Sequence, residues 1–328
     1  MKIPVTILTG FLGSGKTTLL KNILQENHGH RIAVIENEFG EEGIDNDLLF
    51  QDSDEQIVEM NNGCICCTVR GDLVRILGEL VEKKENGSIA FDRVVIETTG
   101  LADPAPVAQT FFVDESVSEK YLLDAIVTMV DGKHASQQFD EHHEAQEQVG
   151  FADRILFTKT DLIEPLAFEA LRQRVVKMNP RAKIGVARHG VSSVDDLFDI
   201  RGFNLNSILE IEPNFLTDVD HEHDDEVTSF VFRESRALRL EPLEEFMDGL
   251  VQIYGVNLMR YKGVLNIKGQ ERRVVFQGVH MLMGSELGSP WRPGEKRQSK
   301  MVFIGKNMPK DSIMNGLSLC IDKKASAK

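Results

Sequence analysis

The chain of 328 residues has a formal net charge of −15, with 41% hydrophobic and 27% charged residues. This composition is that of a globular protein, and the length predicts two domains because one core rarely serves more than about 250–300 residues. The negative charge argues against a polyanionic partner, so we expect no binding to nucleic acid or to an anionic membrane face. Since no apolar run is long enough to span a membrane and the first residues read as a strand instead of a signal peptide, we expect a cytoplasmic protein.

The first predicted element is an apolar strand over residues 3–8, and a loop and a helix over residues 18–25 follow it. The loop, Gly10-Phe11-Leu12-Gly13-Ser14-Gly15-Lys16-Thr17, matches the phosphate-binding pattern G-x-x-x-x-G-K-[ST]. Glycines let the backbone turn its N–H groups toward a phosphate, and the helix N-terminus adds about half a positive charge. We predict a nucleoside triphosphate site in which Lys16 reaches the outer phosphates and Thr17 binds Mg2+. The predicted nucleotide-binding residues here are Gly10, Gly13, Ser14, Gly15, Lys16, Thr17 and Thr18.

Strands and helices alternate along the next part of the chain. Further strands are predicted over residues 31–35, 56–60, 93–96, 125–130, 154–157 and 183–186. The helix after the second of these carries Leu73, Ile76, Leu77 and Leu80 at helical spacing, and another helix starts near Pro165. This alternation predicts an α/β fold with a doubly wound, mostly parallel sheet, in which ligands bind at the carboxyl ends of the strands.

The strand over residues 93–96 ends in Glu97-Thr98-Thr99-Gly100, and Asp103-Pro104 opens the next helix. This turn stands where a nucleotide-binding sheet senses the terminal phosphate, with glutamate in place of the usual aspartate. We predict that Glu97 contacts the metal ion or its water and that Gly100 offers its N–H to the γ-phosphate. Together with Lys16 they form the predicted catalytic set. A strand that ends in a solvated acid is the alternative interpretation.

The strand over residues 154–157 ends in Thr158-Lys159-Thr160-Asp161, which resembles the guanine-reading loop N-K-x-D. A carboxylate at Asp161 matches the two hydrogen-bond donors of guanine that adenine lacks, and Lys159 would lay its stem along the base. Because Thr158 replaces the usual asparagine, the sequence favours guanine over adenine without deciding it, and an ordinary turn is the alternative. The stretch 187–190 is a further candidate for the base site.

Three of the four cysteines lie together in Cys64-Ile65-Cys66-Cys67, at a predicted strand-to-helix turn. The spacing does not suit a disulfide framework, but it offers thiolates at about 2.3 Å to Zn2+, or equally to Co2+. We expect a further ligand from the acidic segment 36–42, which emerges at the same edge of the sheet. Cysteines that fill the core as small hydrophobes are the alternative.

Two further stretches contain histidines. His142 and His143 are flanked by Glu141 and Glu144, and we expect them to lie on the solvated surface of a polar helix. His221-Glu222-His223 lies in an acidic stretch and is a candidate for transient metal loading.

The alternating pattern ends near residue 204. We predict a P-loop GTPase domain over residues 1–208, an acidic linker with His-x-His over 209–225 and a smaller C-terminal domain over 226–328. Strands over 227–232, 258–267, 273–277 and 301–304, with helices over 242–254 and 310–319, predict an α+β layer with a ferredoxin-like layout.

These motifs resemble the CobW-like branch of the SIMIBI-class P-loop GTPases, in particular the YjiA-type zinc-binding GTPases. The resemblance covers both domains and is carried by residues 10–17, 36–41, 63–67, 97–104 and 158–161. It implies that Glu36 and Glu41 share a metal with Cys66, whereas Cys64 and Cys67 are ligands or exchange partners. The linker departs from the family pattern, since it holds only His221 and His223 where many relatives have a longer histidine-rich tract, which argues against metal storage.

The resemblance implies a metallochaperone GTPase that binds GTP or GDP with Mg2+ and couples slow hydrolysis to delivery of Zn2+, with Co2+ or Ni2+ as alternatives. Its implied partners are an apo-metalloprotein client and a second copy of the chain. Both predicted metal-binding segments lie between the phosphate loop and Glu97, so a switch that follows the γ-phosphate can make or break metal ligands. Two other hypotheses are a non-enzymatic metal sensor with a structural nucleotide, and a regulatory NTPase with structural or redox-active cysteines.

Overall fold

The computed structural model describes residues 2–26, 28–36, 57–59, 68–203 and 225–322. The chain forms two compact units, one from residues 1–171 and 183–203 and the other from 172–182 and 204–328. Helix α7 (Pro165–Met178) therefore contributes its second half to the C-terminal unit. The domain limits at residues 208 and 226 stay a prediction, since the intervening 204–224 lie outside the described residues.

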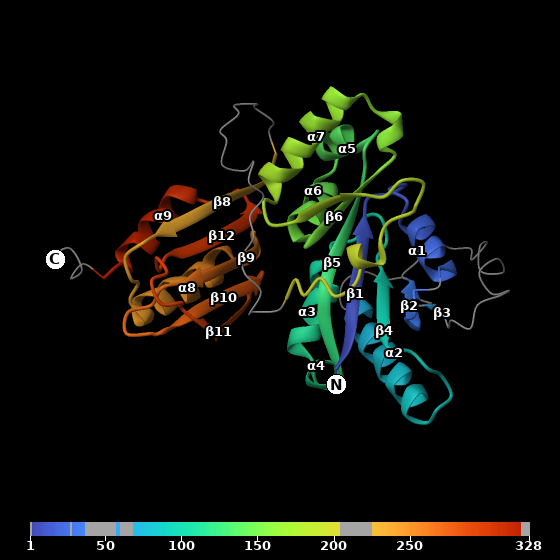
Figure 1. Ribbon diagram of the computed structural model, residues 1–328, viewed down its shortest axis with the longest axis horizontal. Helices are drawn as coiled ribbons and strands as arrows, with labels where there is room; N and C mark the ends of the chain where they lie inside the picture. The colour runs from blue at the N-terminus through green and yellow to red at the C-terminus, as the bar shows by residue number, and fades with distance from the viewer. Residues whose placement is uncertain (1, 27, 37–56, 60–67, 204–224, 323–328) are drawn as a thin grey trace. The chain divides into compact units, whose positions relative to one another are not determined.

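The N-terminal unit is built on a parallel sheet with the strand order β3-β2-β4-β1-β5-β6-β7 (Figure 1). The strands are β1 (Ile3–Gly10), β2 (Ile32–Glu36), β3 (Ile57–Glu59), β4 (Arg93–Glu97), β5 (Tyr121–Asp131), β6 (Arg154–Thr158) and β7 (Lys183–Val186). The chain winds from β1 out to β2 and β3 on one side, returns to place β4 between β1 and β2, and then winds from β5 to β7 on the other side. Because the strands are parallel, the carboxyl ends of β1, β4, β5 and β6 share one edge. The predicted doubly wound α/β fold is confirmed.

Helices connect these strands and bury their apolar faces. They are α1 (Lys16–Gln25), α2 (Thr68–Glu85), α3 (Ala105–Val113), α4 (Glu115–Lys120), α5 (Ala135–Glu141), α6 (His143–Phe151) and α7, with short 3-10 turns at Thr160–Leu162 and Val194–Asp196. In α1, Leu19 and Ile23 pack with Val34 and Val127 of the sheet in one buried cluster. The spacing of four residues between Leu19 and Ile23 puts both side chains on one face of the helix.

One helical stretch differs from the sequence prediction. The polar helix expected around His142 and His143 is two helices, α5 and α6, and His142 lies at the break between them. The side chains of His142 and His143 are 43% and 57% exposed, as predicted, but α6 also has a buried face, on which Ala145, Val149 and Phe151 are each no more than 3% exposed. The charged residues at its start hide this buried face in the sequence.

The C-terminal unit is a five-stranded antiparallel sheet with the order β11-β10-β9-β12-β8. Its elements are β8 (Val227–Glu234), α8 (Leu240–Tyr254), β9 (Leu258–Leu265), β10 (Arg272–Val279), β11 (Leu282–Pro290), β12 (Ser299–Lys306) and α9 (Lys310–Leu319). Strands β8 and β9 flank β12 and are joined through α8, which gives the split β-α-β unit of ferredoxin-like folds. The smaller α+β domain is confirmed.

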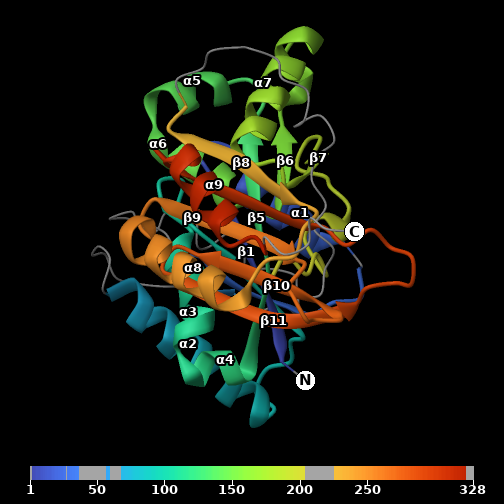
Figure 2. The same cartoon turned by 90° about the vertical axis from the view of Figure 1, so that its left-hand side faces the viewer.

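Both helices of this unit cover the same face of the sheet (Figure 2). Leu243, Met247 and Leu250 of α8 pack with strand residues and with Ile313 of α9 in one buried cluster. The spacing of these α8 residues matches one face of a helix. At the centre of the cluster, Phe230 and Phe303 stack with their ring centroids 5.2 Å apart.

Strand β11 is the element that the sequence does not predict. It is an edge strand. Its sequence contains Gly284, Ser285, Glu286 and Gly288 and few apolar residues, so it lacks the alternation of apolar and polar residues that predicts a strand. Its hydrogen bonds to β10, with Val275 opposite Glu286, define it as a strand. This strand therefore forms because it pairs with β10, and that pairing is a feature of the tertiary structure that its own sequence does not reveal.

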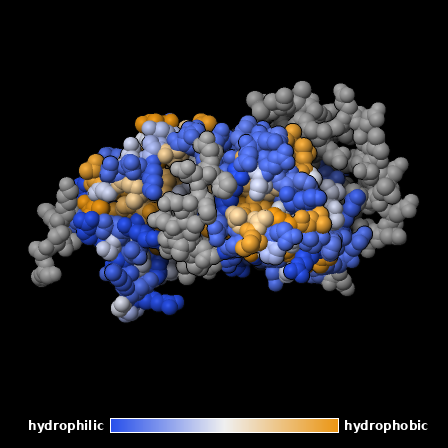
Figure 3. All heavy atoms as spheres, turned by 90° about the horizontal axis from the view of Figure 1, so that it is seen from above, coloured by the Kyte–Doolittle hydropathy of each residue, from blue (hydrophilic) through white to orange (hydrophobic). Residues whose placement is uncertain are grey.

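Hydrophilic residues dominate the surface drawn in Figure 3, and apolar residues appear there in separate patches. Among the helices that the structure describes, none combines the length and apolar character needed to cross a membrane.

A buried ion pair fastens the start of β8 within the C-terminal unit. The Arg174 guanidinium donates to both carboxylate oxygens of Asp225, with Nη2 2.6 Å from Oδ1, and the two side chains are only 4% and 9% exposed. Ser229 Oγ also donates to Lys177 O at 2.5 Å. A buried charge that loses its partner is costly, because water cannot replace the lost interaction.

We predict that Arg174→Met lowers the free energy of unfolding of this unit by about 3 kcal/mol, because it leaves the Asp225 carboxylate buried and unpaired. Trp291 is the single tryptophan of the chain and lies in this unit, so its fluorescence during urea unfolding reports on the unit selectively. The control is Lys268→Met, which breaks the half-exposed pair with Asp322 and is expected to cost less than about 1 kcal/mol. Equal losses in the two variants would contradict the prediction.

Candidate functional site

The phosphate loop joins β1 to α1 in a conformation that needs glycine. Gly10, Gly13 and Gly15 have φ values of 143°, 72° and 95°, which residues with a side chain rarely adopt. A Cβ atom at Gly10 would also collide with Met129 O and lie 2.8 Å from Ser14 Oγ. These glycines therefore allow the tight turn by which the loop can present its backbone N–H groups to a phosphate.

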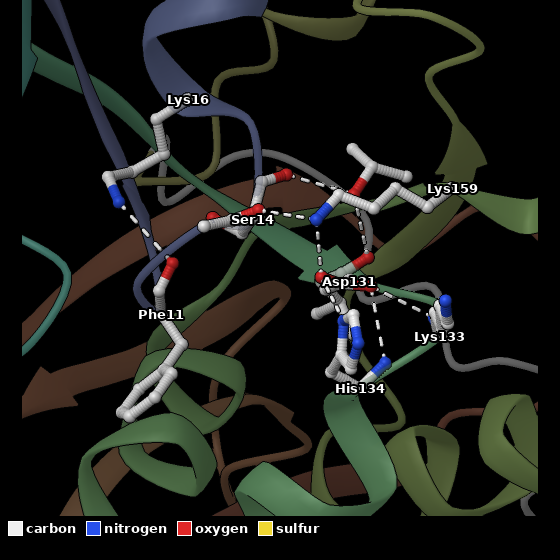
Figure 4. Close-up of polar contacts among 10 residues, drawn as sticks. Phe11, Ser14, Lys16, Asp131, Lys133, His134 and Lys159 are labelled. Atoms are coloured by element: carbon white, nitrogen blue, oxygen red, sulfur yellow. Dashed lines mark hydrogen bonds and ion pairs between the residues drawn. The ribbon is translucent and has the colours of Figure 1, made fainter.

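The outward-facing carbonyl groups of this loop accept hydrogen bonds from side chains. There are four such hydrogen bonds: Lys16 Nζ donates to Gly10 O (2.7 Å) and to Phe11 O (3.5 Å), Lys159 Nζ to Gly13 O (2.9 Å) and Thr158 Oγ1 to Ser14 O (2.9 Å). Two of these donors come from the end of β6, more than a hundred residues along the chain. The predicted phosphate loop and the predicted base loop are therefore hydrogen-bonded to each other, and Figure 4 shows Ser14 of the first loop next to Lys159 of the second.

The predicted catalytic residues Lys16 and Glu97 lie beside Thr17. Lys16 is 8% exposed, and burial lowers the pKa of its ammonium group while the Glu97 carboxylate acts to raise it. The Thr17 hydroxyl donates to Glu97 Oε1 at 3.0 Å. Two hard oxygen ligands next to the phosphate loop are a donor set that fits Mg2+.

The turn after β4 rests directly on the phosphate loop. A Cβ atom at Gly100 would lie 2.7 Å from Leu12 N and 2.8 Å from Leu12 Cα, so no larger residue fits without movement. The turn is anchored at its start, where Thr98 Oγ1 donates to Thr9 Oγ1 at 2.8 Å. Asp103 accepts a hydrogen bond from Ala105 N and opens α3 as the sequence predicts. The predicted phosphate-sensing glycine is thus held against the predicted phosphate loop.

On the base side of the site, Lys159 bridges the phosphate loop and β5. It has a left-handed φ of 52°, and its Nζ lies 2.7 Å from Asp131 Oδ2, which also contacts His134 Nδ1 at 2.9 Å (Figure 4). Burial raises the pKa of Asp131, but the hydrogen bonds from Lys159 and His134 outweigh it and lower the pKa overall. Asp161 is exposed and makes no hydrogen bond or ion pair with the described residues, so its carboxylate can meet a base.

The candidate stretch 187–190 forms a tight turn against α1. His189 and Gly190 have positive φ values, and Asn22 Nδ2 donates to His189 O at 3.2 Å. A Cβ atom at Gly190 would lie 2.7 Å from Thr18 Cγ2. The stretch therefore lies next to Thr18, at the start of the helix that follows the phosphate loop.

The predicted metal ligands are only in part within the described residues. Glu36 ends β2, and its Cα pairs with that of Glu97 on β4, so both residues stand at the same edge of the sheet. Glu41, Cys64, Cys66 and Cys67 lie outside the described residues, as do His221 and His223. Within the described part of the chain, no three His, Cys, Asp or Glu side chains gather into a metal site.

Sequence reasoning missed three residues that contact these loops. Asp131 holds Lys159, Gln148 donates to Gly100 O and Ala102 O at 3.1 Å each, and the His142 ring lies 4.8 Å from the Phe11 ring. Asp131 carried a signal, since an acid followed by glycine ends a predicted strand. Gln148 and His142 carried none, because their partners are far away in sequence.

Family models match both units of the chain. Residues 4–185 match the CobW/HypB/UreG nucleotide-binding domain, and residues 227–321 match the C-terminal domain of the cobalamin synthesis protein cobW.

Relatives resemble the chain over most of its length. Zinc chaperone YjiA of Escherichia coli is 43% identical over 95% of this chain and 96% of its own length. Zinc-regulated GTPase metalloprotein activator 1 of Schizosaccharomyces pombe is 37% identical over 64% of this chain and 52% of its own. A crystal structure of the Zn(II)-bound YjiA GTPase from E. coli superposes with a TM-score of 0.81 at 37% identity, and covers 98% of this chain and 100% of that one.

We predict that Thr158→Val weakens guanine nucleotide binding about fivefold, because it removes the bond of about 1 kcal/mol that ties β6 to Ser14 O. Equilibrium titration with fluorescent GDP and a GTP analogue measures the change, and Thr158→Ser, which keeps the hydroxyl, is the control. Adenine nucleotides are expected to lose the same factor. A change in the guanine-to-adenine ratio would mean that Thr158 reads the base instead.

Proposed function

Since the chain belongs to the CobW/HypB/UreG family, we propose that it is a metallochaperone GTPase, which hydrolyses GTP to GDP and phosphate and couples the nucleotide state to binding and delivery of Zn2+. The observation that carries the proposal is the register of β2 and β4. Glu36, a predicted metal ligand, stands opposite Glu97, and Glu97 accepts the hydrogen bond of Thr17. One pair of strand ends thus serves both the nucleotide and the metal.

The nucleotide half of the proposal assigns a role to each contact. The phosphate loop binds the phosphates through its N–H groups, and Lys16 leaves Gly10 O to reach the terminal phosphates. Thr17, with Glu97 near it, would hold Mg2+, which would supply positive charge to the phosphate oxygens. Asp161 binds the guanine edge, and Lys159, fixed by Asp131, flanks the base. The proposed contacts include no arginine finger or general base, so turnover without a partner is slow.

The metal half of the proposal rests on Glu36, Glu41, Cys64, Cys66 and Cys67. Thiolate and carboxylate ligands suit Zn2+, and the names of the relatives support zinc as the cargo. Co2+ and Ni2+ share this ligand preference, so supply in the cell contributes to the choice. Movement of the segment after Glu36 with the γ-phosphate would bring these ligands together or separate them.

The proposed partners follow from this cycle. An apo-metalloprotein client receives the ion, and a second copy of the chain pairs with the nucleotide face. Because three thiols must stay reduced to bind metal, we place the protein in the cytoplasm.

The test is a titration of reduced protein with Zn2+ or Co2+ in the presence of GTP analogue, of GDP and of no nucleotide. We expect the metal affinity to differ by about tenfold between the GTP analogue and GDP, which is a typical coupling between two sites. Equal affinity in all three states would overturn the coupling and leave a metal sensor with a structural nucleotide.

A matched pair of cysteine variants checks the ligands. Cys66→Ser is expected to abolish most of the Co2+ thiolate absorption, whereas Cys320→Ser, which changes a buried cysteine of the C-terminal unit, is expected to keep it. An unchanged absorption band in the Cys66 variant would remove that residue from the proposed site.

A further inference from the structure

Gln148 holds the phosphate-sensing turn through hydrogen bonds to its carbonyl groups. Its Nε2 donates to Gly100 O and to Ala102 O, at 3.1 Å each, from a side chain that is 1% exposed. Gly100 in turn packs against the Leu12 backbone, where no Cβ atom fits. The turn is therefore held by the Gln148 amide and is also in close contact with the phosphate loop.

Gln148 is itself fixed in place. Its backbone carbonyl accepts a hydrogen bond from Thr128 Oγ1 at 2.7 Å, which ties this turn of α6 to the buried strand β5. Since β5 pairs with β1 and β1 leads into the phosphate loop, the amide and the loop share one rigid frame. A tether from such a frame can define the position of the turn to a fraction of an ångström.

A glutamine at position 148 is less favourable for stability than an apolar residue if its role is only to fill space. Both acceptors are carbonyl groups, so the nitrogen must face them, and Oε1 is buried with no hydrogen-bond partner among the described residues. A buried acceptor left in this way is destabilising, because it has lost its hydrogen bonds to water. An apolar side chain of the same volume would avoid this cost, but it would leave the carbonyls of Gly100 and Ala102 without the Gln148 donor, so the two bonds to the turn are what the amide adds.

We propose that Gln148 is a positioning residue for GTP recognition, which sets the distance between the Gly100 N–H and the terminal phosphate. This inference rests on the proposed function, in which Gly100 meets the γ-phosphate. GDP has no γ-phosphate, so the two hydrogen bonds from Gln148 contribute to binding of GTP and not of GDP. Gln148 touches neither the nucleotide nor the metal in this proposal and acts through the turn.

The test compares two glutamines of the same helix. Gln148→Met removes both bonds and keeps the volume. The control is Gln146→Met, since Gln146 is 4% exposed and donates to Phe139 O at 2.7 Å, away from the turn. We expect the ratio of GTP-analogue to GDP affinity to fall about tenfold in the Gln148 variant, which is somewhat less than the full contribution of two ordinary hydrogen bonds, and to stay unchanged in the control.

Each outcome is decisive when the unfolding midpoint is measured beside the affinities. A ratio that stays at the wild-type value in both variants, or falls equally in both, overturns the positioning role. If neither the wild-type chain nor the Gln146→Met control binds GTP analogue, the proposed function itself fails, and this result is distinct from a failure of the positioning role.

A second variant keeps the proposal testable if Gln148→Met does not fold. In Gln148→Glu only the protonated acid can donate to the carbonyls, so the GTP-analogue to GDP ratio is expected to be several-fold higher at pH 6 than at pH 8. The wild-type ratio, measured over the same range, supplies the baseline. A ratio with the same pH profile as the wild type contradicts the proposal.

Discussion

The site depends on a constraint of the backbone. A loop that turns its N–H groups toward a phosphate turns its carbonyl groups away from it, and each of these needs a donor. Here the donors for Gly13 O and Ser14 O are Lys159 and Thr158. The loop that would bind phosphates is thus completed by donors from the loop that would read the base, so the two loops stabilise each other.

Strand β4 connects the phosphate loop to the rest of the site. Its last residue, Glu97, is bonded to Thr17 at one side and paired in register with Glu36 at the other. The turn that follows is pressed on Leu12 and held by Gln148. The phosphate loop and the end of β2 are therefore connected through the ends of two adjacent strands.

The fold could be predicted to the extent that patterns are local. The alternation of apolar strands with helices gave the parallel sheet, and the four leucine and isoleucine residues of α2 gave its buried face. Edge strand β11 could not be predicted, since its partner β10 and not its own sequence makes it a strand. The buried face of α6 was hidden for a related reason, because its neighbours and not its composition exclude water.

By itself the sequence determined the phosphate loop, since eight consecutive residues contain the glycines and the lysine that the turn requires. It also determined that Glu97 and Asp161 follow strands, and therefore that they stand at the ligand-binding edge of a parallel sheet. Only the tertiary structure decided what holds these groups in place: Asp131 for Lys159, Thr158 for Ser14 and Gln148 for Gly100. The reason is that local geometry follows from neighbouring residues, whereas a hydrogen bond between distant segments exists only after the strands have paired.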